Sequence, residues 1–118
     1  MNTYIFTVSP QETERIANGD QTVLVRKKAP KAPFKAVMSD KIYRGQGKAI
    51  GEFICDKVDF LAPRGIKDIP LYYSDKWLKE TLKKAGLTCD QAIAYQGNKS
   101  DIYALHITAQ KLYDKEEK

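Results

Sequence analysis

Five segments that favour β-strands are spread along the chain, separated by glycine, proline and small polar residues. Aromatic and β-branched residues dominate them, and Tyr4, Phe6 and Val8 alternate along the first. The second is apolar on both faces, which predicts a strand at the centre of a sheet. The fourth is long, and we expect it to bend at Gly51 or near Asp56. The segments are Thr3–Val8, Gln21–Lys27, Phe34–Ser39, Lys48–Leu61 and Ile102–Leu112.

A short helix is predicted directly after the first strand. The Ser9 side chain can cap the backbone N–H of Glu12, whose side chain can reach back to Ser9. Pro10 suits the first helical position because it has no N–H to leave unpaired. Gly19 ends the helix, since glycine adopts the left-handed conformation without a Cβ clash. A helix of two turns is too short to be stable alone, so it must pack on the strands.

Two more helices are predicted between the fourth and fifth strands. The first begins after Ser74 or Asp75 and ends at Gly86, with apolar residues spaced along one face. A second capping box at Thr88 begins a short helix that ends at Gly97. About five strands with two or three short helices indicate an α+β domain built on a small closed or half-closed sheet. We expect residues 1–118 to form a single domain with a polar tail at about 113–118.

Turn-forming residues predict the remaining connections. Pro30 and Pro33 stiffen a basic loop before the third strand. Residues 40–47 are interpreted as a turn made flexible by glycine. The Pro63-Arg64-Gly65 segment and Pro70 predict a loop after the fourth strand.

Composition excludes several classes of protein. No apolar run approaches the roughly 20 residues that a membrane helix needs, and no secretory signal is visible. The only cysteines, Cys55 and Cys89, are too few for a disulfide framework or a four-thiolate zinc site, so a cytoplasmic setting without metal or cofactor is expected. We interpret Cys55 as a buried, inert thiol. Cys89 lies beside a helix N-terminus, which can lower a thiol pKa, but an inert role is favoured there too.

Positive charge is concentrated in one stretch. Residues 26–48 contain eight basic residues and one acidic residue, a net charge of +7. The rest of the chain has twelve basic and fourteen acidic residues, a net charge of −2, and the whole chain is therefore +5. A field focused on one segment suits a polyanion, although a solvated loop of lysines is the alternative. The basic residues that we single out are Arg26, Lys27, Lys28, Lys31, Lys35, Arg44 and Lys48.

Tyrosines offer a way to stack bases beside this charge. The chain has seven, of which Tyr43 lies inside the basic stretch and Tyr103 lies in the last strand. Aromatic faces stack unpaired bases while lysines and arginines neutralise phosphates. The alternative is half-buried packing with the hydroxyl in water.

The single histidine, His106, lies in the last predicted strand. Alternation places it on the less apolar face with Ala104 and Thr108, where it can face a polar cleft. A structural histidine with a satisfied hydrogen bond is the alternative, and we favour it over a catalytic one.

Several stretches follow one another in a recognisable order: Ser9-Pro10, Ile16-Ala17-Asn18-Gly19, residues 22–27 with Pro30, Pro33-Phe34-Lys35, residues 47–56, residues 103–107 and residues 112–115. Their order and spacing resemble those of ASCH-domain proteins, including small forms from phages and prophages. The resemblance covers most of the chain except residues 60–87. It implies the small β-barrel of the PUA-like superfamily, with a cleft beside the first helix and the strand after Gly19, and a role in binding RNA or another nucleic acid.

Some ASCH-like proteins are similar to amidohydrolases that act on a modified cytidine, and ribonuclease activity is proposed for others. In the amidohydrolase branch, a lysine and a threonine stand where this chain has Gln21 and Leu24. Neither replacement can act as a base or nucleophile, which argues against that chemistry. Thr22 and Arg26 do match, so the resemblance implies a cleft that binds an anion or a base.

Three functions follow as hypotheses. The first is a nucleic-acid-binding module that uses the basic residues, Thr22, a stacking tyrosine and His106. The second is a hydrolase of RNA or a modified nucleoside, with Glu52 and His106 as acid/base groups and Lys48 stabilising negative charge. The third is a protein-binding phage adaptor.

Overall fold

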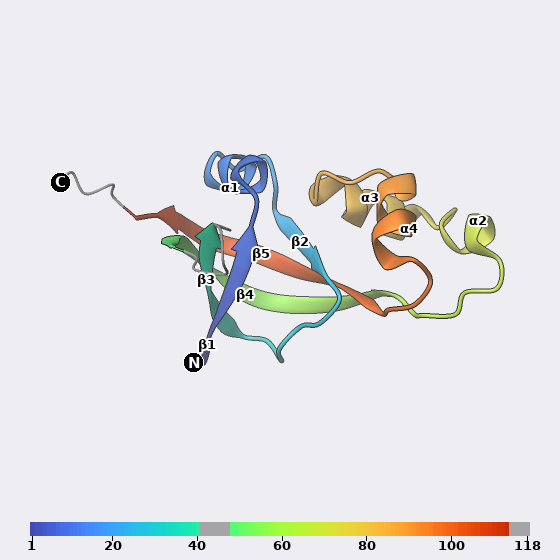
Figure 1. The fold of residues 1–118 in the computed structure, drawn as a ribbon, viewed down its shortest axis with the longest axis horizontal. Helices are drawn as coiled ribbons and strands as arrows, with labels where there is room; N and C mark the ends of the chain where they lie inside the picture. The colour runs from blue at the N-terminus through green and yellow to red at the C-terminus, as the bar shows by residue number, and fades with distance from the viewer. Residues whose placement is uncertain (41–47, 114–118) are drawn as a thin grey trace.

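The computed structural model describes residues 1–40 and 48–113. Five strands form one sheet in these residues, and four helices accompany it (Figure 1). The helices lie in two groups, with α1 over one part of the sheet and α2, α3 and α4 together at the other end. The elements are β1 (Thr3–Val8), α1 (Pro10–Ala17), β2 (Val23–Arg26), β3 (Phe34–Asp40), β4 (Ala49–Ala62), α2 (Ile69–Tyr72), α3 (Lys76–Lys84), α4 (Cys89–Gln96) and β5 (Ile102–Leu112).

The strand order in the sheet is β1-β3-β4-β5-β2. β1 and β3 are parallel, whereas the other neighbours are antiparallel. The sheet curls into a half-barrel, which confirms the predicted α+β barrel-like fold. The bounds of the first and last predicted strands, Thr3–Val8 and Ile102–Leu112, match the structure.

Local sequence signals position the helix ends as expected. The Ser9 hydroxyl accepts the Glu12 N–H in α1, and Thr88 and Gln91 form a complete capping box in α4. Asp75, one of the two residues expected to cap the following helix, caps α3. The short helix α2 was not predicted, because Pro70 indicated a loop there. Pro70 lies in its first turn, where proline is tolerated.

The prediction that the second strand is central was wrong. β2 lies at an edge of the sheet and pairs only with β5 among the described strands. Its apolar character on both faces has another cause, since each face packs into a separate hydrophobic core. Leu24 packs with Ile16 of α1, while Val23 and Val25 pack with α3 and α4. Helices cover both faces of this edge strand. It therefore lacks the alternation of apolar and polar residues that is typical of an edge strand with one face in solvent.

The long strand β4 is irregular near the expected positions. Its pairing with β5 shifts register between Cys55 and Val58, which agrees with the bend predicted near Asp56. At Gly51 the backbone of β5 approaches closely. A Cβ at this position would lie 2.7 Å from the carbonyl oxygen of Lys111 and 2.9 Å from Cε of Met38, so only glycine fits without displacement.

No helix in the described part of the chain is long and apolar enough to cross a membrane.

Candidate nucleic-acid interface

Arg26 is the last residue of β2 and connects the two edges of the half-barrel. Its Nη1 donates a hydrogen bond to the Val25 oxygen at 2.8 Å, and its Nη2 donates to the Thr7 oxygen of β1 at 2.8 Å. Nη2 also lies 3.3 Å from Oε1 of Glu12 in α1. These contacts already use Nη1 and Nη2 of the guanidinium. The main role of Arg26 in the structure is therefore to hold the two edge strands together, and it has little capacity left to bind a ligand.

The connection from β2 to β3 carries the most accessible positive charge of the predicted site. Lys27, Lys28 and Lys31 are all exposed, and none of them forms an ion pair with a described residue. Nζ of Lys27 lies 4.9 Å from the centre of the Tyr95 ring, a cation–π contact that leaves its charge at the surface. These lysines can bind phosphate without first breaking an ion pair.

An aromatic pair lies in register with the end of β2. Arg26 is opposite Tyr103 of β5, and Tyr103 is opposite Phe60 of β4, so the three residues form one row across the sheet. The rings of Tyr103 and Phe60 meet edge to face with centroids 5.5 Å apart. Tyr103 is partly buried, whereas Phe60 is 49% exposed. The row therefore presents an aromatic surface beside the basic connection.

Sequence reasoning did not identify Phe60. The alternation of side chains along the predicted fourth strand could assign Phe60 to one face of the sheet. It could not show which residue of a neighbouring strand lies opposite Phe60. The placement of β5 beside β4 brings Tyr103 and Phe60 together.

Other predicted basic residues lie away from this connection. Nζ of Lys35 lies 3.2 Å from Oε1 of Glu52, so its charge is already paired. Lys48 is exposed beside Asp40, at the far end of β3 from Phe34. Seven residues of β3 separate the two ends by about 20 Å. Tyr43 and Arg44 lie outside the described residues.

Thr22 and His106 are neighbours across the β2–β5 pairing, and the Thr22 side chain is exposed. The Thr22 N–H donates to the Lys84 oxygen at 3.0 Å, and the Thr22 oxygen accepts from Ile107 N–H at 2.9 Å. His106 Nε2 lies 2.7 Å from Oδ2 of Asp59. His106 thus has the hydrogen-bond partner that was expected for a structural histidine. Since β5 side chains alternate, His106 and Tyr103 lie on opposite faces of the sheet.

The residues named for hydrolase chemistry do not meet. Glu52 is opposite Lys111 of β5, and His106 is five residues away along that strand, or about 16 Å. The Tyr113 hydroxyl donates a hydrogen bond to Glu52 at 2.9 Å. That bond, followed by Lys35, lowers the pKa of the Glu52 carboxyl, which makes it a weak base. Glu52 and His106 therefore do not form one catalytic site.

Gln21 and Leu24 both have structural roles. Nε2 of the buried Gln21 donates to the Val23 oxygen at 2.9 Å, and Oε1 accepts from Nε of Arg15 at 3.2 Å. Leu24 is fully buried in the core beneath α1. Neither side chain is available to a substrate.

Residues 1–40 and 48–113 contain no cluster of three or more His, Cys, Asp or Glu residues that would hold a metal ion. Burial raises the pKa of the Cys55 thiol, as expected for an inert cysteine. Cys89 is partly buried, and its Sγ lies 3.8 Å from the Tyr73 oxygen.

The fold is that of ASCH-domain proteins. The structure is similar to the crystal structure of the ASCH protein from Zymomonas mobilis, with a TM-score of 0.65, 15% sequence identity, and coverage of 94% of this chain and 70% of that one. A serine-to-alanine variant of that protein gives a TM-score of 0.66 with the same identity and coverage. A tyrosine-to-phenylalanine variant gives 0.66 at 15% identity, covering 95% of this chain and 73% of that chain. No model of a known protein family and no curated protein sequence matches this chain.

Proposed function

We propose that the chain is a small ASCH-type domain of the kind found in phages and prophages, and that it binds RNA in the cytoplasm. The observation that carries the proposal is the set of unpaired, exposed lysines next to the row formed by Arg26, Tyr103 and Phe60. Lysines neutralise phosphates, and aromatic rings stack on unpaired bases. The free thiols of Cys55 and Cys89 fit a reducing compartment.

Binding is tested with the purified full chain and fluorescently labelled single-stranded RNA, duplex RNA and DNA. The measurement is fluorescence anisotropy at two salt concentrations. Lys28→Ala/Lys31→Ala removes two phosphate contacts and leaves the Arg26 contacts intact. For single strands, the slope of log affinity against log salt is expected to fall by about 0.7 for each lost contact.

A control of equal charge separates a local interface from general attraction. Lys57→Ala/Lys111→Ala also removes two exposed lysines, but from β4 and β5. The affinity of this control for nucleic acid is expected to stay close to that of the unmodified chain, whereas the affinity of Lys28→Ala/Lys31→Ala is expected to fall. Equal losses in the two variants contradict a defined interface. Absence of binding at low salt contradicts nucleic-acid binding and favours a protein partner.

Hydrolysis of RNA or a modified nucleoside is a second candidate, favoured by one observation. Asp59 lies 2.7 Å from His106, and a carboxylate can orient an imidazole as a general base. Both side chains are about one quarter exposed, so a substrate can reach them. Labelled RNA incubated with the unmodified chain and with His106→Ala tests this function. Cleavage that persists unchanged in His106→Ala contradicts it.

A further inference from the structure

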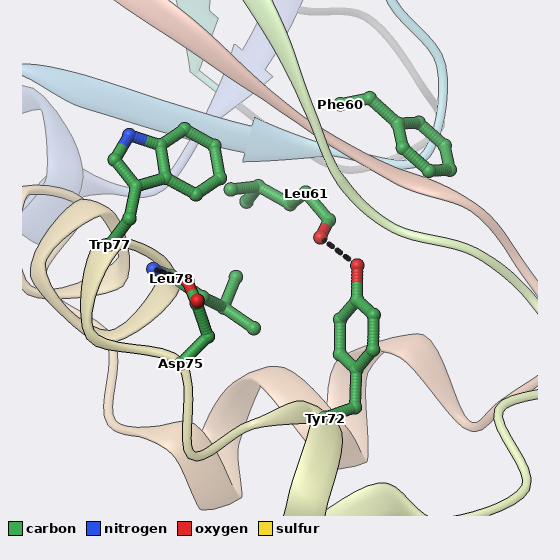
Figure 2. Close-up of a pocket in the computed structure, with 6 residues that line it drawn as sticks. All are labelled: Phe60, Leu61, Tyr72, Asp75, Trp77 and Leu78. Carbon is green, nitrogen blue, oxygen red and sulfur yellow. Dashed lines mark hydrogen bonds between the residues drawn. The ribbon is translucent and has the colours of Figure 1, made fainter.

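A second feature suited to an unpaired base lies between the end of β4 and helices α2 and α3. It is a pocket of about 390 Å³, here called the Trp77 pocket, lined by Phe60, Leu61, Tyr72, Asp75, Trp77 and Leu78. Figure 2 shows the indole of Trp77 and the ring of Tyr72 on opposite sides of the space, with Leu61 at its upper edge. The volume lies near the lower end of the range of about 300–1,000 Å³ for ligand pockets, which suits one small group.

One aromatic wall of the pocket is held in place by a hydrogen bond, and the other is partly open to solvent. The Tyr72 hydroxyl donates a hydrogen bond to the Leu61 oxygen at 2.7 Å, which orients the ring. Trp77, the second residue of α3, is 48% exposed. The Phe60 ring points to the other side of β4, away from the space between Trp77 and Tyr72. Phe60 contacts Tyr103 on that other face, so the pocket and the aromatic row of the candidate interface lie on opposite faces of β4.

The charges in and around the Trp77 pocket determine which part of a nucleic acid can enter it. Asp75 is the one charged residue that lines the pocket, and a carboxylate repels phosphate. Outside, α3 carries four exposed lysines against one glutamate. Phosphates are therefore attracted to the helix surface, while the interior accepts an uncharged ring. The lysines are Lys76, Lys79, Lys83 and Lys84, and the glutamate is Glu80.

Asp75 also supplies selectivity among bases. Its Oδ2 accepts the Leu78 N–H at 2.9 Å as the cap of α3. In residues 1–40 and 48–113, no hydrogen bond or ion pair engages its Oδ1. A carboxylate oxygen accepts hydrogen bonds from the exocyclic amines of cytosine and adenine, which uracil lacks.

We propose that the Trp77 pocket binds one unpaired nucleobase bearing an exocyclic amine, from a single-stranded RNA whose phosphates lie along α3. This inference rests on the proposed function, because it assigns one base of the bound RNA to a site across β4 from the aromatic row. It adds a residue set that neither the basic stretch nor the sequence resemblance included.

The fluorescence of Trp77 provides a direct test, because it is the only tryptophan of the chain. Labelled oligonucleotides of cytidine, adenosine and uridine are titrated into the full chain. Anisotropy reports binding, and intrinsic fluorescence reports stacking on the indole. Oligocytidine and oligoadenosine are expected to quench Trp77 and to bind more tightly than oligouridine.

Variants assign the effect to the pocket. Trp77→Ala is expected to weaken oligocytidine binding by about 5- to 150-fold, the range for loss of one stacked base. Asp75→Asn keeps a capping oxygen for α3 and is expected to remove the preference for cytidine over uridine. Leu71→Ala, at a 69% exposed residue of α2 outside the pocket, is the control and is expected to bind normally.

The possible failures are distinguishable. Binding seen by anisotropy, with no Trp77 quenching and a normal Trp77→Ala variant, overturns the pocket and leaves the interface standing. If no oligonucleotide binds, the proposed function fails, and cytidine and uridine monophosphates are titrated instead. Quenching by the cytidine compound alone then supports the pocket, and no response overturns it. Self-association that Trp77→Ala abolishes shows a second copy in the pocket and also overturns the inference.

Discussion

The guanidinium of Arg26 donates a hydrogen bond to the carbonyl oxygen of Thr7 and so joins the two outermost strands of the sheet. These strands do not pair with each other through backbone hydrogen bonds in the described structure. One side chain therefore fastens the open side of the half-barrel, and its additional contact with Glu12 extends the connection to α1.

Arg26→Ala is expected to lower the free energy of unfolding by about 1–3 kcal/mol, because it removes the hydrogen bonds that a charged donor makes to the Val25 and Thr7 oxygens. Arg26→Lys is expected to recover only part of this loss, since an ammonium lacks the planar fork that reaches both oxygens. Urea denaturation measures both variants. Lys28→Ala, at an exposed neighbour, is the control, and an Arg26→Ala variant as stable as this control contradicts the fastening role.

Gly51→Ala is expected to destabilise the protein by about 1–3 kcal/mol, the usual cost of overpacking a tight site. The added Cβ would meet the backbone oxygen of Lys111, which cannot move without shifting β5. Thermal unfolding of Gly51→Ala, compared with Ala49→Ser at an exposed position of the same strand, measures the effect. Equal melting temperatures in these two variants rule out a close approach at Gly51.

Glu52 is expected to titrate below its ordinary value of 4.5, because Tyr113 and Lys35 both favour the charged carboxylate. A lowered pKa in the folded state contributes stability above the unfolded pKa, and this contribution is lost as pH falls through the folded pKa. Carbon-detected NMR titration of the carboxyl group measures the shift. Tyr113→Phe is expected to move the pKa back upward, and an unchanged titration in that variant excludes the hydrogen bond as the main cause.

The two thiols are expected to react at different rates with an aromatic disulfide reagent in the native protein. Cys55 is buried with a raised pKa, so it stays protonated and inaccessible, whereas Cys89 is partly exposed. Cys89→Ser is expected to remove the faster phase. Loss of the faster phase in Cys55→Ser instead would contradict its assignment to Cys89. As a control, both thiols are expected to react fully in denaturant.

Local features of the fold were predictable because they depend on neighbouring residues. The caps at Ser9 and Thr88 and the bounds of β1 and β5 follow from hydrogen bonds and alternation within a few positions. The edge position of β2 was not predictable from its composition. Two cores bury it, and one of them is formed with helices about fifty residues later in the chain.

The candidate site was predicted only in part for the same reason. The basic stretch was visible as composition, and the exposed connection that carries Lys27, Lys28 and Lys31 agrees with it. The pairing of Lys35 with Glu52 requires β3 beside β4. The role of Arg26 as a bridge requires the barrel to curl, since Thr7 is nineteen residues away in sequence. Phe60 and Trp77 became candidates only when the structure showed their exposure.

The position of β5 between β4 and β2 has a consequence for synthesis of the protein. The ribosome makes Arg26 well before Ile102, where the strand that pairs with β2 begins. At about 5–20 residues per second, a ribosome needs about 4 to 15 s to make the intervening residues. During that interval β2 has no strand partner, and its apolar side chains lack the core contacts with Ile102, Ala104 and Leu105. The nascent chain therefore waits for its last strand, and a ribosome stalled before Ile102 holds an incomplete sheet that a chaperone can bind.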